Sequence, residues 1–184
     1  MPSDYADAAL LLMDVQAGIV DRLPDPAAYL AAAAETLAAA RAAAVPVLHV
    51  VVGFRPGFPE VSPRNQAFRN LKQAAPSFTE PRPSLPPAAG EVVVVKRRVS
   101  AFAGSDLEVV LRAREIRHLV LAGIATSGVV LSTLREAADK DFQLTVLSDL
   151  CADFDPEVHA VLMNKLFPRQ AEVLSRAAWL QRLS

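Results

Sequence analysis

The sequence predicts an α/β fold in which helices cover both faces of a central, mostly parallel six-stranded sheet, a three-layer αβα arrangement. Apolar, β-branched segments alternate with helical segments along almost the whole chain, which is typical of this class. The predicted strands are continuous apolar runs, as expected for strands buried on both faces of a parallel sheet. With 184 residues, of which 52% are hydrophobic, the chain is expected to form one domain over residues 1–184.

The first half of the chain is expected to hold three strands and one long helix. The strands are short apolar runs, whose length suits strands better than helices; they cover residues 8–13, 45–52 and 91–96. The helix begins at Pro26, because proline is tolerated in a first helical turn, and its alanine-rich stretch ends near Ala44. The proline-rich segments between the second and third strands are predicted to be irregular, with a short helix between them; the irregular segments are 53–63 and 76–90, and the helix is 64–74.

The second half repeats the alternation with shorter elements. Three further apolar runs predict strands over residues 118–122, 142–147 and 172–174. Amphipathic segments between and after them predict helices over residues 105–115, 128–140, 156–166 and 176–183. In such a fold ligands bind outside the carboxyl ends of the strands, so polar residues at these positions are the first candidates for a site.

Composition argues against several classes of partner. The net charge is −1 and the isoelectric point about 6.3, so no basic face for nucleic acid is expected. No apolar run reaches the ~18 residues that span a bilayer, and residues 1–4 lack the basic start of a secretory signal. A single cysteine excludes an internal disulfide. The sequence contains no glycine-rich phosphate loop, so it gives no indication of a cofactor. We therefore expect a cytoplasmic protein that binds a small molecule, with no cofactor, nucleic-acid or membrane partner.

Three of the predicted strand ends carry polar groups that should meet at one edge of the sheet. Asp14 follows the first strand, Lys96 ends the third, and Thr126 and Ser127 occupy the turn after the fourth. A carboxylate beside an ammonium group can perform acid–base chemistry, and the backbone N–H groups at the start of a helix from Gly128 could stabilise an oxyanion. Either charged residue alone would more simply be a turn cap or a solvent-facing side chain; their pairing on one edge favours a functional site.

Several ordered motifs resemble the isochorismatase-like hydrolase superfamily, the cysteine hydrolases. They are LLLMDVQ at residues 10–16, KRRVSAF at 96–102 with SDL at 105–107, LVLAGIATSGVV at 119–130 with Thr133, Ala137 and Ala138, and finally Ser148, Asp149 and His159. The resemblance spans nearly the whole chain and implies a Rossmann-like fold. It also implies that Asp14 and Lys96 are two members of an Asp-Lys-Cys catalytic triad.

The third member of that triad is missing. By the resemblance the cysteine position is Val129, and an alignment shifted by one residue gives Gly128; neither side chain has a nucleophilic atom. The family's cis peptide bond would fall at Ala125–Thr126, with residues 125–127 forming the oxyanion turn. The remaining nucleophile candidates are Cys151, Ser127 and Ser132, and each is better interpreted as a structural residue.

The other polar and aromatic residues are assigned by position. The resemblance implies zinc in some amidases of the superfamily, but residues 53–58 lack a suitable ligand set and the histidines, His49, His118 and His159, form no cluster, so no metal site is expected. Residues at the predicted strand ends and in the loop after the second strand are candidates for substrate contacts; they are Gln16, Phe54, Arg55 and Phe102. Arg55 could bind a carboxylate, although a solvated loop is an equal alternative.

Three functions remain open. The first is a hydrolase that uses Asp14 and Lys96 without a covalent intermediate, because the resemblance includes isochorismatases that cleave a vinyl ether without the cysteine. The second is an inactive binding or assembly protein of the same fold, and the third is an amidase with an unrecognised nucleophile. The resemblance also implies a homodimer or homotetramer.

Overall fold

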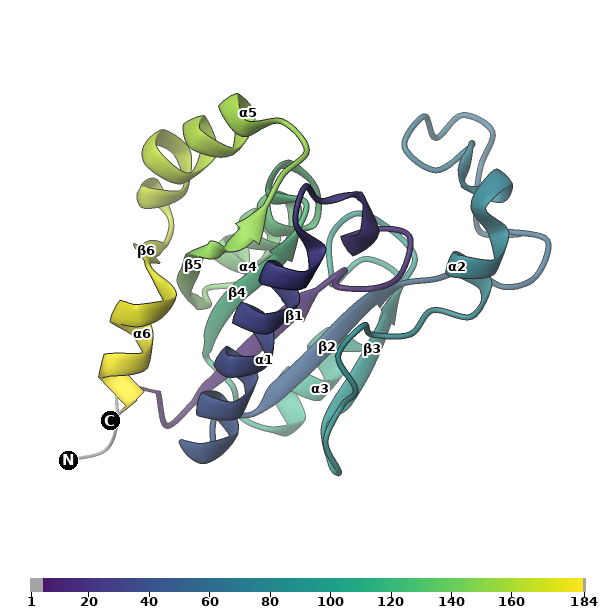
Figure 1. Ribbon diagram of the computed structural model, residues 1–184. Coiled ribbons are helices and arrows are strands. Elements are labelled where there is room, and N and C mark those ends of the chain that lie inside the picture. The colour runs from purple at the N-terminus through teal and green to yellow at the C-terminus, as the bar shows by residue number, and fades with distance from the viewer. Residues whose placement is uncertain (1–4, 184) are drawn as a thin grey trace.

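The computed structural model describes residues 5–183, apart from the side chains of residues 72 and 74–76 (Figure 1). Residues 1–4 and 184, which include the N-terminal start that lacks a signal pattern and both ends of the predicted domain, lie outside this description. Six parallel strands form one sheet in the order β3-β2-β1-β4-β5-β6, so the predicted fold class is confirmed. The strands are β1 (Ala8–Met13), β2 (Val47–Val52), β3 (Val92–Lys96), β4 (His118–Ile124), β5 (Gln143–Ala152) and β6 (Glu172–Leu174).

Over residues 5–183, six α-helices and five helical turns lie between and after the strands. The α-helices are α1 (Pro26–Ala42), α2 (Ala75–Thr79), α3 (Leu107–Ala113), α4 (Leu131–Asp139), α5 (Pro156–Val161) and α6 (Arg176–Leu183). The turns are η1 (Val20–Arg22), η2 (Leu71–Ala74), η3 (Thr126–Val130), η4 (Leu162–Leu166) and η5 (Phe167–Arg169). Helix α1 begins where the sequence predicts, because the Asp25 carboxylate accepts the N–H of Ala28 at 2.9 Å and Pro26 follows it.

The prediction differs from the structure in the segment between β2 and β3. No helix spans residues 64–74; η2 begins only at Leu71, and α2 lies inside the segment predicted to be irregular. Pro76 is compatible with this helix because it occupies the first turn, where a backbone N–H is not needed. Strand β5 is also longer than predicted and continues to Ala152, so Cys151 lies within the strand rather than after it.

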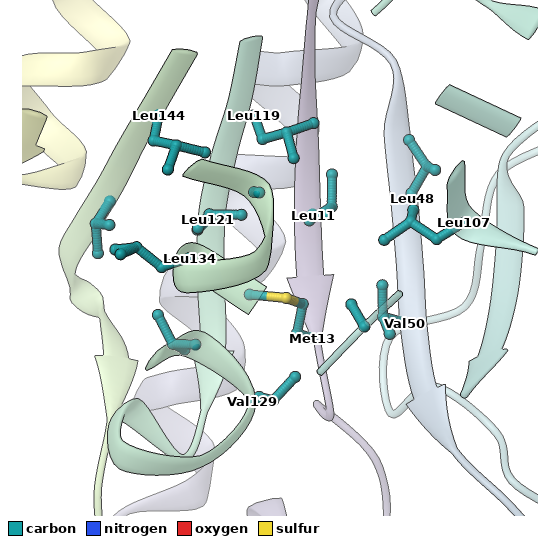
Figure 2. Packing of buried hydrophobic residues seen from close by; sticks show 14 of the residues in the cluster. Leu11, Met13, Leu48, Val50, Leu107, Leu119, Leu121, Val129, Leu134 and Leu144 are labelled. Carbon is teal, nitrogen blue, oxygen red and sulfur yellow. The ribbon is translucent and has the colours of Figure 1, made fainter. Parts of the chain in front are cut away.

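The two faces of the sheet bury alternate side chains of each strand. On one face, Leu11 of β1 and Leu121 of β4 pack with Leu107 of α3 and Leu134 of α4 (Figure 2). On the other face, Leu10 of β1 packs with side chains of α1 and α6, whose largest member is the fully buried Trp179. Burial on both faces explains why the strand sequences are continuous apolar runs, and each buried leucine contributes about 1.5–3 kcal/mol.

A third, smaller core holds the segment that follows β2. Phe54, Phe58 and Phe68 have neighbouring ring centroids 5.5 Å apart, and Phe78 completes the cluster. In Figure 1 this segment, which ends in α2, extends away from the edge of the sheet beyond β2 and β3. It stands at the carboxyl ends of those strands, where it can form a wall of a site.

The strand order creates a switch point at the centre of the sheet. The chain proceeds outward from β1 through β2 to β3 and then crosses to β4 on the other side of β1. In open parallel sheets, ligands bind outside the carboxyl ends of the strands at such a point. Within the described residues, no helix is both long and apolar enough to cross a lipid bilayer.

Candidate functional site

Asp14 follows the carboxyl end of β1 directly. Its φ of 56° lies in the left-handed region, which aspartate tolerates better than most residues, and its N–H donates to the carbonyl of Val50 at 2.7 Å. The backbone is therefore turned away from the strand direction at the switch point. This turn keeps the carboxyl group buried, with 6% of the residue exposed.

Lys96 reaches the same place from the end of β3. Its side chain is only 2% exposed, its Nζ lies 2.9 Å from Oδ2 of Asp14, and the ammonium also donates to the carbonyl of Arg98 at 3.0 Å. The two charged residues are 82 positions apart in the sequence, yet the parallel strands carry both to one edge. The structure thus brings together the two residues that the sequence singles out.

The pair is unbalanced in its hydrogen bonding. Oδ2 of Asp14 contacts Lys96, whereas no group in residues 5–183 hydrogen-bonds its buried Oδ1. Burial raises the pKa of Asp14 from 3.8 to about 6, and the charge and hydrogen bond of Lys96 oppose that rise. A carboxyl group with this pKa can both donate and accept a proton near neutral pH.

The end of β4 approaches the backbone of Met13, just before Asp14, closely because it contains Gly123. A Cβ at this position, where φ is 147°, would lie 2.1 Å from the carbonyl oxygen of Met13, so only glycine fits. The cis peptide bond joins Ile124 to Ala125, one residue earlier than the predicted Ala125–Thr126 bond. The sequence motif located the turn correctly but assigned this bond to the wrong pair.

The backbone donors of this turn are already used within the protein. The N–H groups of Gly128 and Val130 donate to the carbonyl of Ala125 at 3.1 and 3.3 Å, and that of Ser127 donates to the Asp153 carboxylate at 2.6 Å. These donors are therefore not directed at a substrate oxygen. Of the predicted oxyanion residues 125–127, Ser127 has its N–H taken by Asp153, and the oxyanion site stays a prediction.

Thr126 has a partner that the sequence did not suggest. Its Oγ1 lies 2.9 Å from Nδ1 of His159 on α5, and Thr126 itself is fully buried. This contact joins the turn to α5 and gives His159 a partner within the fold. The two residues are 33 positions apart, and only the packing of α5 against the turn brings them together.

Val129 occupies the position where the family resemblance places a cysteine. It is 2% exposed and belongs to the same buried cluster as Met13 and Val50, as Figure 2 shows at the end of β1. Its side chain also lines the cavity that contains Asp14 and Lys96. A hydrocarbon side chain at this point can shape a substrate but cannot attack it.

A cavity of about 180 Å³ opens beside these residues. Its volume is below the ~300–1,000 Å³ of pockets that hold drug-sized ligands, so it has room only for a small molecule. The lining is formed by Asp14, Gly18, Ile19, Arg22, Val52, Ala67, Phe68, Leu71, Phe78, Lys96, Val99, Ile124, Ala125, Gly128, Val129 and Phe154. A wider hollow of about 400 Å³ lies at the amino ends of β4 and β5, but its Arg112 and Lys140 already pair with Glu108, so we assign the site to the smaller cavity.

The four predicted substrate contacts do not line this cavity. Gln16 accepts the N–H of Val52 at 2.8 Å and donates to its carbonyl at 3.1 Å, so its amide joins two chain segments. Phe54 is buried in the aromatic cluster, and Phe102 packs in the core on the α4 face. The exposed Arg55 pairs with Glu60 at 2.6 Å. The structure therefore places these four side chains outside the cavity lining, with partners elsewhere in the fold, and their contact with a substrate stays a prediction.

Four other side chains take their place. Arg22, Phe68, Phe78 and Phe154 line the cavity, and they come from η1, from the segment after β2 and from the loop after β5. Their motifs are not distinctive in the sequence. The one available signal was position, since Phe154 follows a strand on the carboxyl edge of the sheet.

Cys151 and the turn serines do not replace the missing nucleophile. The Cys151 thiol is buried in β5 and donates to the carbonyl of Leu121 at 3.8 Å, and burial raises its pKa to about 12. It is not part of the cavity lining, and neither is Ser127 or Ser132. Within residues 5–183, no group of three His, Cys, Asp or Glu side chains is arranged to hold a metal ion.

Comparison with known proteins places these features in a family. The isochorismatase domain family matches residues 8–178. The chain is 36% identical over 180 residues to the isochorismatase family protein YecD of Escherichia coli O157:H7, with 91% of each chain covered. It is 31% identical over 181 residues to the ureidoacrylate amidohydrolase RutB of Methylobacterium radiotolerans, covering 84% of this chain and 70% of that protein. The structure of an isochorismatase family protein from Burkholderia thailandensis superimposes with a TM-score of 0.82 and 31% identity, covering 96% and 95% of the two chains.

Proposed function

The chain belongs to the isochorismatase family of hydrolases, and from this premise we propose that it hydrolyses a small vinyl ether by proton transfer from Asp14. One observation carries the proposal. A buried carboxyl group with a pKa near 6 lines a small cavity, beside a valine at the position of the family's nucleophile. This combination favours acid–base chemistry over a covalent thioester.

The reaction begins with the protonated Asp14. Its O–H donates the proton to the terminal carbon of the C=C–O group, and the electron pair of the double bond forms the new C–H bond. The adjacent carbon becomes an oxocarbenium ion, which water attacks while the Asp14 carboxylate accepts a proton from that water. The resulting hemiketal transfers its hydroxyl proton to the ether oxygen as the C–O bond breaks, which releases an alcohol and a carbonyl compound.

Lys96 positions and tunes the acid. Its ammonium holds Oδ2 at 2.9 Å, which leaves Oδ1 as the oxygen available to a substrate. Its positive charge also stabilises the Asp14 carboxylate that forms when the proton leaves. The apolar wall around the pair, including Val129, lowers the local dielectric and so strengthens the interaction of Lys96 with the Asp14 carboxylate.

Amide hydrolysis remains the competing chemistry, because the RutB relatives are named as ureidoacrylate amidohydrolases. A thioester route would need a thiol in the cavity. Cys151 does not line that cavity, and its pKa of about 12 keeps it protonated at neutral pH.

The test compares two substrate classes in parallel. The wild-type protein, Asp14→Asn and the control Glu91→Gln are assayed on isochorismate and simple enolpyruvyl ethers, and on ureidoacrylate and other small amides. We expect turnover of an ether that is lost in Asp14→Asn, retained in Glu91→Gln and insensitive to iodoacetamide. Amide turnover that iodoacetamide abolishes would favour the amidase, and turnover of neither class would favour a binding protein.

A further inference from the structure

One side chain at the cavity has a charge that nothing in the proposed reaction uses. Arg22 lies in η1, the short turn after β1, and its guanidinium carbon stands 4.0 Å from the centre of the Phe154 ring. Both side chains line the cavity, although their positions are 132 residues apart. The guanidinium group thus lies over the Phe154 ring in a cation–π contact.

The charges of the cavity lining do not cancel. When Asp14 is ionised, it and Lys96 neutralise one another, and the remaining lining residues other than Arg22 are uncharged. Within the described part of the chain, no hydrogen bond or ion pair engages the Arg22 guanidinium. The cavity therefore carries one uncompensated positive charge.

The acidic residues nearest to Arg22 and Phe154 in the sequence are engaged elsewhere. The Asp21 carboxylate accepts the N–H of Gly18 at 2.9 Å. The Asp153 carboxylate accepts the N–H groups of Ser127 at 2.6 Å and Asp155 at 3.2 Å. The Asp155 carboxylate accepts the N–H groups of Glu157 at 2.9 Å and Val158 at 3.2 Å. All three carboxylates therefore bind backbone N–H groups, so the guanidinium edge is left for a group from outside the protein.

We propose that Arg22 binds a carboxylate of the substrate, so that the protein acts on a small carboxylic acid. With one face on the Phe154 ring, the guanidinium still presents its edge N–H groups, which match a carboxylate in a two-hydrogen-bond arrangement. The apolar part of the substrate lies between this anchor and Asp14, against Phe68, Phe78 and Val129. The inference rests on the proposed function only in taking the same cavity as the substrate site.

Binding measurements test the anchor without any chemistry. Titration calorimetry compares benzoate, its neutral analogue benzamide and phenyl phosphate on the wild-type protein, Arg22→Met and Arg22→Lys. The control is Arg55→Met, which removes an exposed guanidinium that pairs with Glu60 outside the cavity. We expect Arg22→Met to weaken benzoate binding at least ~10-fold and to leave benzamide within ~2-fold, because the lost hydrogen bonds are charge-assisted. Arg22→Lys should recover part of the affinity, and Arg55→Met should match the wild type.

Several results would overturn the anchor. These are equal binding of benzoate and benzamide, benzoate affinity unchanged in Arg22→Met, no benzoate binding by the wild-type protein, or a clear preference for phenyl phosphate. Because no turnover is measured, the outcome is independent of the reaction. A carboxylate that binds through Arg22 in a protein without ether hydrolysis would refute the proposed function alone.

Discussion

Two carboxylates at opposite ends of the parallel strands, the partly buried Glu91 and the buried Asp14, have contrasting surroundings. Glu91, just before β3, accepts two hydrogen bonds from Arg41 at 2.7 and 2.9 Å, the N–H of Ala88 at 2.7 Å and a contact from His49 at 3.0 Å. Asp14, after β1, has Lys96 at 2.9 Å and one oxygen for which the described residues provide no hydrogen bond. The first carboxylate is saturated, whereas the second is not.

The pKa values follow from this difference. Hydrogen bonds from Arg41 outweigh burial and lower the pKa of Glu91 from 4.5 to about 2, whereas burial outweighs Lys96 and raises that of Asp14 to about 6. A saturated carboxylate stays ionised and joins α1, β2 and the start of β3. A carboxylate with an unused oxygen and a pKa near neutrality can exchange protons. We therefore assign a catalytic role to Asp14 and a structural role to Glu91.

The largest expected effect separates the two carboxylates by activity. Asp14→Asn should lower kcat/KM for the ether about 10²–10⁴-fold, because it removes the proton donor while keeping the size of the side chain. The kcat/KM of Glu91→Gln should stay within about threefold of the wild-type value, since Glu91 lies at the amino end of β3, away from the cavity. Steady-state kinetics on purified, folded variants measures both; comparable losses in the two variants would contradict the assignment.

For the free energy of unfolding, the two variants should rank in the reverse order, with the larger loss in Glu91→Gln. Glu91→Gln is expected to lower the free energy of unfolding by about 1–3 kcal/mol at pH 7, because it removes charge-assisted hydrogen bonds. Since the folded state lowers the Glu91 pKa, its contribution is complete above about pH 4.5 and is lost as the pH falls toward about 2. Urea unfolding of both proteins at a series of pH values checks this, and a difference that grows toward low pH would refute it.

Asp14 should affect stability with the opposite sign of pH dependence. Its folded-state pKa is raised, so its contribution to stability is complete below about pH 3.8 and is lost as the pH rises through about 6.

In catalysis, an acid with a pKa of about 6 gives a kcat/KM for the ether that falls above about pH 6. Lys96→Met should move this limb upward by about one pH unit, because it removes the charge that lowers the Asp14 pKa. A limb that stays in place would show that Lys96 does not tune Asp14.

The smallest expected effect concerns two positions for a thiol. Cys151 should resist iodoacetamide at pH 8, because burial raises its pKa to about 12. Val129→Cys should create a thiol of lower pKa, since position 129 shares the cavity with the Lys96 ammonium. The rate of alkylation against pH measures it, with Val129→Ser as the control for Cys151 alone. An ordinary thiol pKa at position 129 would mean that the turn does not activate a nucleophile.

The local sequence pattern was enough to predict the fold and part of the candidate site. Continuous apolar runs predicted strands buried on both faces, and proline, glycine and alanine predicted much of the rest. Asp14 and Lys96 could be paired because strands that run in parallel end at a common edge. The predicted helix over residues 64–74 was wrong because aromatic packing organises the segment between β2 and β3. The helix in this segment is α2, which contributes Phe78 to that packing.

The sequence alone therefore predicted the parallel sheet and the end of its strands at which the candidate site lies. Together with the family resemblance, it also placed Val129 at the position of a nucleophilic cysteine. Tertiary structure alone decided which loop side chains enter the cavity: Arg55 turns to Glu60, while Arg22 meets Phe154 from the other half of the chain. Strand direction is encoded by a local period of side chains. The direction of a loop side chain depends on contacts with segments far away in the sequence, which no local pattern contains.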